Sequence, residues 1–170
     1  MIKTSIVKEN GEYDMRRKDR EITEISEIME IIKKCDVCNL AFFDEKYPYV
    51  IPLNFGAVNI DGKVVLYFHG SKVGKKIELL EKNNLVAFEM DCSHKLLLAE
   101  TACNSTMEFE SVCGNGMIEI LEEDEKIAAL TILMNQYEVK AEHKFNENHL
   151  KAIVVLKLTV DEITGKRLKK

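Results

Sequence analysis

The sequence contains no tryptophan, only two prolines (Pro48 and Pro52) and no long apolar run. A membrane helix needs about 20 consecutive apolar residues, and no segment approaches that length. The first twenty residues are polar, so they lack the apolar region of a secretory signal. These absences predict a cytoplasmic protein with no membrane-spanning segment.

Internal repeats, low-complexity stretches and linkers rich in Pro, Gly or Ser are also lacking. We therefore expect residues 1–170 to form one domain, with residues 1–20 as a polar N-terminal arm. The net charge of -5 does not favour nucleic acid as a partner, because contacts with phosphates require a basic surface. The five cysteines are an odd and scattered set, which predicts reduced thiols.

Apolar residues recur at helical spacing in three segments. The first has Thr23 as its expected N-cap, and its apolar residues are Ile22, Ile25, Ile28, Met29 and Ile32. The second covers roughly residues 72–82, with Val73, Ile77 and Leu80 on one face. The third is predicted over Glu123–Gln136, with an apolar stripe of Ile127, Leu130, Thr131 and Met134.

Shorter apolar runs predict strands at Cys38–Phe43, Tyr49–Asn59, Lys63–His69, Leu85–Met90, Thr106–Leu121 and Ile153–Val160. Asp61 and Gly62 separate two of these runs, and an Asp-Gly pair is typical of a tight hairpin turn. A tight turn makes the strands that it joins antiparallel. The predicted fold is therefore mainly β with flanking helices: an antiparallel closed or split β-barrel.

The segment His69–Lys76 leads from the end of a predicted strand into a helix, and reads HGSKVGKK. Backbone N–H groups at a helix N-terminus, a hydroxyl and nearby ammonium groups together form a cradle for phosphate. Lysines at a helix start oppose the helix dipole, and a bound anion would offset that cost. A P-loop does not fit, because the loop is one residue short and lacks the hydroxyl that binds magnesium. The alternative is a solvated helix face.

Five segments carry a family resemblance through their order and spacing. They are residues 15–22 (MRRKDREI), 47–56 (YPYVIPLNFG), 66–80 (LYFHGSKVGKKIELL), 110–116 (ESVCGNG) and 163–166 (ITGK). Together they resemble the FMN-binding split-barrel superfamily of pyridoxamine 5′-phosphate oxidase, and most closely its nitroimidazole-resistance (Nim) branch. The resemblance implies an antiparallel split barrel that binds FMN at the subunit interface of a homodimer.

The resemblance also implies which residues meet the cofactor. Lys75 and Lys76 match the cations that hold the FMN phosphate in related oxidases, and Ser71 would add a donor. Glu110 and Ser111 would reach the cofactor from the other subunit. The remaining implied contacts, along the flavin ring and ribityl chain, are Pro52, Leu53, Asn54, Phe68, His69 and Gly70.

The expected activity is reduction of a small-molecule acceptor such as a nitroimidazole, with NADH or NADPH as a candidate electron donor. His69 is the candidate catalytic residue, because imidazole can donate a proton near neutral pH. The alternative role of His69 is to orient the loop. Oxidation of pyridoxamine phosphate is not expected, because the chain ends at Lys170 without the family's final Arg- and His-bearing segment. A non-catalytic protein that stores, delivers or senses FMN is the second interpretation.

Cys35 and Cys38 form a C-x-x-C pair. A thioredoxin-like motif would need a βαβ setting, and a zinc site would need two further ligands, for which Cys92 and His94 are the available pair. Free, buried or half-buried thiols are the simpler interpretation, also for Cys103 and Cys113.

Three further patterns have structural interpretations. Gly114-Asn115-Gly116 lacks the third glycine of a dinucleotide fingerprint and predicts a bulge or a close backbone approach. Glu108 and Glu110 alternate with apolar residues, which predicts a solvent-facing side of a strand, with a pair of carboxylates as the alternative. The polar residues 142–149 predict a surface loop.

Overall fold

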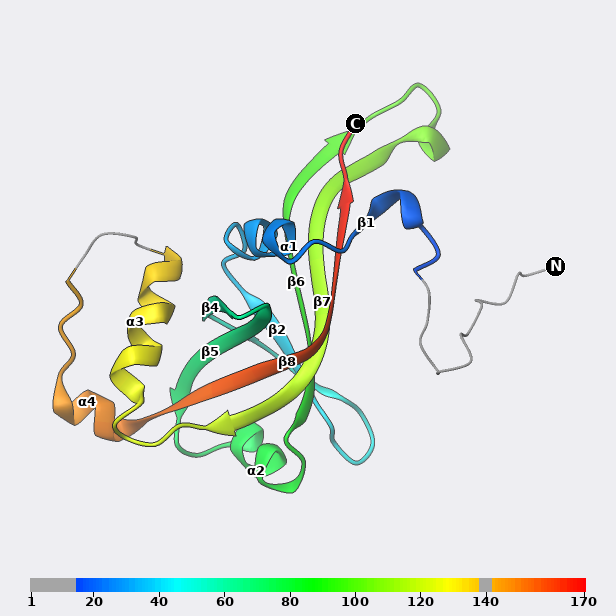
Figure 1. The fold of residues 1–170 in the computed structure, drawn as a ribbon. Helices are drawn as coiled ribbons and strands as arrows, with labels where there is room; N and C mark the ends of the chain where they lie inside the picture. Colours follow the sequence, from blue (N-terminus) through cyan, green and yellow to red (C-terminus); the bar gives the residue numbers. More distant parts are fainter. Residues whose placement is uncertain (1–14, 138–141) are drawn as a thin grey trace.

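The computed structural model describes residues 15–137 and 142–170 of the chain, so residues 1–14 of the expected N-terminal arm lie outside the described part. One antiparallel sheet dominates the fold (Figure 1). Its strands are β1 (Glu21–Ile22), β2 (Cys38–Phe42), β3 (Tyr49–Leu53), β4 (Phe55–Ile60), β5 (Lys63–Ser71), β6 (Leu85–Leu97), β7 (Thr106–Ile120) and β8 (Ile153–Leu168). The helices are α1 (Ile25–Ile32), α2 (Lys75–Lys82), α3 (Lys126–Tyr137) and α4 (Glu147–Ala152), with short 3-10 turns at Lys18–Arg20 and Ala102–Asn104.

The strand order explains how the sheet closes. Hydrogen-bonded neighbours run in the order β3-β2-β6-β7-β8-β5-β4, and β1 pairs with β8. β3 and β4 therefore occupy the two ends of the order, although only Asn54 separates them in the chain. A sheet whose two ends are joined in this way curls into a barrel with a seam at Asn54. The predicted antiparallel split barrel with flanking helices is confirmed.

One predicted strand is interrupted at the seam. Tyr49–Asn59 is not continuous, because the chain changes partner strand at Asn54. The hydroxyl of Tyr137, at the end of α3, donates to the carbonyl of Asp36 at 2.8 Å and accepts from the N–H of Phe55 at 3.0 Å. The side-chain amide of Asn54 donates to the same Asp36 carbonyl at 3.0 Å. These bonds satisfy backbone groups that leave the ladder at the seam.

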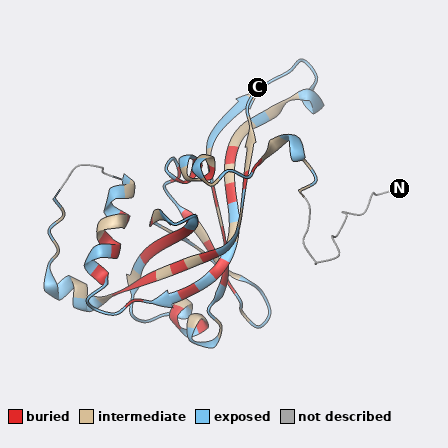
Figure 2. Ribbon diagram, in the orientation of Figure 1, coloured by how far each residue is buried: buried red, intermediate tan, exposed pale blue. Residues whose placement is uncertain are grey.

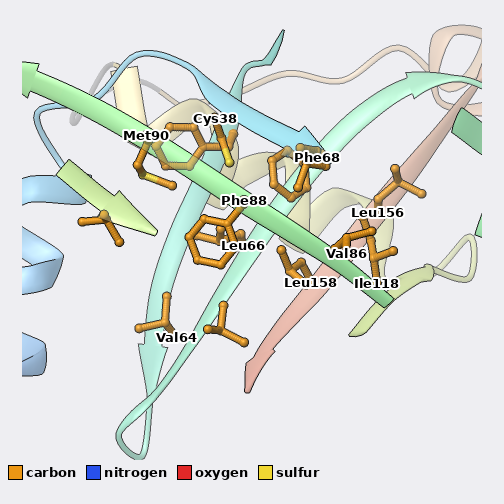
Figure 3. Close-up of a cluster of buried hydrophobic side chains, with 14 of the residues drawn as sticks. Cys38, Val64, Leu66, Phe68, Val86, Phe88, Met90, Ile118, Leu156 and Leu158 are labelled. Atoms are coloured by element: carbon orange, nitrogen blue, oxygen red, sulfur yellow. The ribbon is translucent and has the colours of Figure 1, made fainter. Parts of the chain in front are cut away.

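The barrel interior is filled by residues that alternate along the strands (Figures 2 and 3). On β8, the expected inward face of Val154, Leu156, Leu158 and Val160 is buried as predicted. Val155 points the other way and is also buried, because α3 and its neighbours form a second cluster on the outer side of β5 and β8. The first two helices, through Ile31 and Ile77 among others, add apolar side chains to the inner core.

β6 and β8 are much longer than the sequence pattern predicted. They extend beyond Met90 and Val160 and pair with β7 along the long hairpin that projects from the barrel in Figure 1. Polar residues fill these extensions, so their apolar alternation is weak. The backbone ladder with β7 continues the strands there, although only part of one face, such as Gly165, is buried.

The helix boundaries and faces differ from prediction in three places. α1 begins after Glu24, and Thr23 is not its N-cap. α2 begins at Lys75, so Val73 lies before the helix and is 76% exposed. The buried face of α3 is Lys126, Ala129, Leu130 and Leu133, whereas Ile127 is 51% exposed. In α3, the side chains that contact the sheet are the buried ones. They differ from the apolar stripe that the sequence predicts.

Residues 142–149 are not entirely a loop, because α4 begins at Glu147. The Asn146 side chain caps this helix by accepting from the N–H groups of Asn148 and His149. None of the helices in residues 15–137 and 142–170 has the length and hydropathy that a membrane span requires.

The glycine pair in β7 marks a close backbone approach, as predicted. The β7–β8 register shifts between Asn115 and Gly116. A Cβ atom at Gly116 would lie 2.1 Å from the carbonyl oxygen of Thr159, a distance that no side chain tolerates. The bulge therefore depends on glycine at this position.

We expect Gly56→Ala to destabilise the fold by about 1–3 kcal/mol, because an added methyl group overpacks the site. A Cβ atom at Gly56 would lie 2.4 Å from the Cα of Leu133, so α3 would have to move away from β4. Urea unfolding followed by circular dichroism measures the change. An unchanged unfolding free energy would show that α3 is not seated on β4 in this way.

Candidate functional site

The predicted phosphate cradle lies between the end of β5 and the start of α2. Gly74 is the N-cap of α2, with a φ of 120° that favours glycine. Because glycine has no side chain, no side-chain cap covers the N–H groups of the first helical turn. The N–H of Ile77 already donates to the Gly74 carbonyl oxygen at 2.9 Å. Among the described residues, the N–H groups of Lys75 and Lys76 are the ones in this turn that remain available to an anion.

Lys76 turns back over the strand that precedes the helix. A Cβ atom at Gly70 would lie 2.7 Å from the Lys76 Nζ, so the ammonium group occupies the space that a side chain at position 70 would take. Because position 70 is glycine, the Lys76 ammonium group can lie against the backbone at the end of β5. The backbone N–H groups and this ammonium lie at the same end of α2, and the arrangement fits a phosphate monoester.

Lys75 has an acidic partner that the sequence analysis missed. Its Nζ lies 2.7 Å from Oδ2 of Asp44 and 5.0 Å from the centre of the Tyr49 ring. The hydrogen bond from Lys75 lowers the pKa of Asp44, and Asp44 in turn raises the pKa of Lys75. The Lys75 side chain is half exposed, so its ammonium can exchange the carboxylate for another anion.

His69 and Ser71 are exposed at the end of β5. The Ser71 Oγ accepts from the N–H of Val73 at 3.2 Å, which shapes the turn into α2. Within residues 15–137 and 142–170, the His69 ring has no hydrogen-bond or ion-pair partner. Side chains alternate along a strand, so His69 points to the side opposite the Gly70 position that Lys76 contacts.

The other predicted contacts near the seam divide into exposed and buried groups. Pro52 is exposed on β3, and Asn54 is exposed beside the seam. Leu53 packs against the inner core, and the ring of Phe68 is fully buried there (Figure 3). Any contact of Phe68 with a bound ligand would therefore come from its backbone.

Glu110 and Ser111 lie far from the cradle within one chain. Ser71 pairs with Ile153 at the start of β8, whereas Glu110 pairs with Arg167 near its end. These positions are fourteen residues apart along β8, roughly 46 Å of strand at about 3.3 Å per residue. The structure does not bring them together with the cradle in one subunit, and only a second copy of the chain could do so.

Glu110 is 5% exposed, which corrects the prediction of a solvent-facing carboxylate. Its Oε2 accepts from Lys34 at 2.7 Å and from Ser93 at 2.8 Å, and its Oε1 accepts from Arg167 at 2.6 Å. Burial alone would raise the pKa of Glu110, but the three hydrogen bonds outweigh it and lower the pKa to about 2. Both oxygens are engaged within the chain, so this carboxylate joins the turn after α1 to β6, β7 and β8.

The family model described as pyridoxamine 5′-phosphate oxidase matches residues 24–167. The chain belongs to the pyridoxamine 5′-phosphate oxidase family. A candidate 5-nitroimidazole antibiotic resistance protein from Bacteroides thetaiotaomicron is 34% identical to it over 86% of each chain, with a TM-score of 0.74. No curated protein sequence matches the chain.

More distant solved structures share the fold of this oxidase-family chain. The flavocytochrome Anf3 from Azotobacter vinelandii is 20% identical, covers 92% of this chain and 73% of its own, and has a TM-score of 0.76. An FAD and heme binding protein from Mycobacterium smegmatis is 19% identical, with coverages of 89% and 74% and a TM-score of 0.75.

The cysteines of this oxidase-family chain are all free. Cys35 and Cys38 are buried and Cys92 is half-buried, as expected, but Cys103 and Cys113 are exposed. Burial raises the pKa of the Cys35 and Cys38 thiols. No group of three or more His, Cys, Asp and Glu side chains in the described ranges is arranged to hold a metal ion, so the zinc interpretation has no structural support.

Proposed function

We propose that this chain binds FMN and uses it to reduce small molecules such as nitroimidazoles. The observation that carries the proposal is the start of α2, where the Lys76 ammonium lies against Gly70 beside N–H groups without a side-chain cap, and where Lys75 begins the helix with Asp44 as its partner. A phosphate monoester dianion matches this set of donors. When bound, FMN would supply the hydride and electron chemistry.

The chain's own residues would bind and orient the cofactor. Lys76 and the first N–H groups of α2 hold the phosphate, and Lys75 exchanges Asp44 for the same phosphate. Ser71 is exposed at the end of β5, just before the turn into α2. Pro52 and Asn54 are exposed along β3 and the seam, where they can contact the ribityl chain or ring. Leu53, Phe68 and Gly70 support these positions from the barrel side.

A homodimer is part of the proposal, because none of the described elements covers one face of the sheet. The outward side chains of β3, β2, β6 and β7 form this face, which includes Val50, Ala41, Ala87, Leu85 and Met117. Val50, Leu85 and Met117 are large, exposed apolar side chains. A sheet face of this kind is typical of a protein interface. A second copy on it would also offer Ser111, whereas Glu110 is already held within its own chain.

Similarity to the Bacteroides protein supports a reductase, since this candidate nitroimidazole resistance protein is 34% identical to the chain. NADH or NADPH is the proposed electron donor. The test is anaerobic addition of NADH or NADPH to the flavin-loaded protein, followed by a nitroimidazole. Bleaching followed by recovery of flavin absorbance upon nitroimidazole addition supports the reductase. Bound flavin that neither reductant bleaches would favour the non-catalytic FMN-binding alternative.

We expect His69→Ala to retain FMN but to slow nitroimidazole reduction roughly 100-fold, because a proton donor would be lost. His69 is exposed and has no partner in the described residues, so its removal leaves the cradle intact. Flavin content by absorbance and steady-state rates measure the two effects separately. His149→Ala, in the surface helix α4, is the matched control. Equal rates in wild type and the His69 variant would leave His69 with a role in loop structure alone.

A further inference from the structure

Two thiols that are far apart in the sequence converge on one backbone oxygen. The Cys35 Sγ lies 3.4 Å from the carbonyl oxygen of Ile31, and the Cys92 Sγ lies 3.9 Å from the same oxygen. Cys35 follows α1, and Cys92 lies in the middle of β6. The partner of Cys35 is therefore Cys92, and not the Cys38 of the C-x-x-C pair.

Cys92 lies on the same face of β6 as the buried Met90 and points toward the end of α1, and a β-bulge follows it. The β6–β7 register shifts between Cys92 and Lys95, and Ser93 has a φ of 60°, which is uncommon outside glycine. The Ser93 hydroxyl donates to Glu110 at 2.8 Å and holds the bulge in place.

The two thiols differ in access to solvent. Cys35 is 3% exposed, and burial together with the neighbouring Cys92 thiol raises its pKa. Cys92 is half-buried and lines an open polar cavity of about 370 Å³ with Lys34, Asp91, Ser93 and His94. A small oxidant can reach Cys92 from this cavity, whereas Cys35 lies behind it.

We propose that Cys92 and Cys35 form a reversible disulfide when the protein meets a hydroperoxide. The Cys92 sulfur attacks the peroxide O–O bond, and this step gives a sulfenic acid at Cys92 and releases water or an alcohol. The Cys35 sulfur then attacks the sulfenic sulfur, the S–S bond forms, and the hydroxyl group leaves as water with the Cys35 proton. Two thiols are oxidised and one hydroperoxide is reduced. The inference does not depend on flavin binding.

The disulfide would tie the end of α1 to the β6 bulge. Lys34 precedes Cys35, and Ser93 follows Cys92, so the two residues that bind the Glu110 Oε2 flank the two thiols. The bond would close a long loop, which restricts the unfolded chain. The oxidised protein should therefore melt at a higher temperature than the reduced protein.

The experiment treats the full chain with increasing hydrogen peroxide, blocks free thiols with iodoacetamide, and identifies tryptic peptides by mass. Cys35 and Cys38 share one tryptic peptide, because no Lys or Arg lies between them. In the Cys38→Ser variant, Cys35 is the only cysteine in this peptide, so a link to the peptide must involve Cys35. We expect a dithiothreitol-sensitive link between residues 35–46 and 83–95 in wild type and in Cys38→Ser.

The same link should be lost in Cys35→Ser, which should instead accumulate a dimedone-reactive Cys92. Cys113→Ser is the control for an exposed thiol and should retain the link. The proposal would be overturned if peroxide oxidised Cys103 and Cys113 while Cys35 and Cys92 stayed reduced and were alkylated by iodoacetamide. A Cys35–Cys38 bond in the wild-type chain would also overturn it, and this outcome is readable without any variant.

Discussion

The Lys75→Ala/Lys76→Ala double variant should lose at least about 100-fold in FMN affinity, because two charge-assisted contacts are each worth roughly 1.5–3 kcal/mol. Its affinity for riboflavin, which has no phosphate, should change little. Lys76 lies against Gly70, and Lys75 is half exposed beside Asp44, so neither supports the hydrophobic core. Quenching of flavin fluorescence on titration measures both affinities.

Two further variants test whether the loss of FMN affinity comes from the missing phosphate contacts. Lys82→Ala removes the same charge at the other end of α2 and should leave FMN affinity near the wild-type value. Asp44→Asn removes the carboxylate that competes for Lys75, so FMN should bind at least as tightly as in wild type. An equal loss of FMN and riboflavin affinity in the double variant would point to damaged structure rather than a missing phosphate contact.

Glu110→Gln should lower the free energy of unfolding at pH 7 by about 2–4 kcal/mol, because it leaves two cations around a buried site without their anion. The wild-type carboxylate accepts from Lys34, Ser93 and Arg167, and Arg167 also binds Glu27 at 3.0 Å. Chemical unfolding of both proteins measures the difference. The control is Glu108→Gln, two residues away on the same strand, which should change stability little.

The same carboxylate predicts a pH dependence. The pKa of Glu110 is about 2 in the folded chain against an ordinary value of 4.5, so the unfolded chain takes up a proton first as the pH falls. The stabilisation by Glu110 is therefore complete above pH 4.5 and is lost between about pH 4.5 and pH 2. The stability gap between wild type and Glu110→Gln should shrink over that range. A gap that stays constant down to pH 2.5 would contradict the ion network.

The fold was predictable where apolar alternation sets one face of a strand. The inward face of β8 and the Asp-Gly hairpin between β4 and β5 both follow from local sequence. The break at Asn54 does not follow from local sequence, because Asn54 and Phe55 donate hydrogen bonds to the distant Asp36 carbonyl and Tyr137 hydroxyl, and these bonds hold the seam. The α3 face was also missed, because Leu133 packs where Gly56 leaves space, and only the assembled sheet reveals that fit.

The candidate site was predictable to the extent that it is local. Residues 69–76 are contiguous, so the lysines and the helix start could be recognised together. Asp44 and the partners of Glu110 come from other elements, and no pattern in the sequence connects Glu110 with Lys34 or Arg167. The C-x-x-C spacing of Cys35 and Cys38 was misleading for a similar reason, since the spatial partner of Cys35 lies on β6.

FMN binding is tested most directly by the visible absorption spectrum of the purified chain after incubation with excess flavin and removal of the unbound fraction. We predict a flavin spectrum, with FMN as the compound identified by chromatography after the protein is denatured. A colourless protein under these conditions would contradict flavin binding. Retention of FAD in preference to FMN would contradict the proposed match between the cradle and a phosphate monoester.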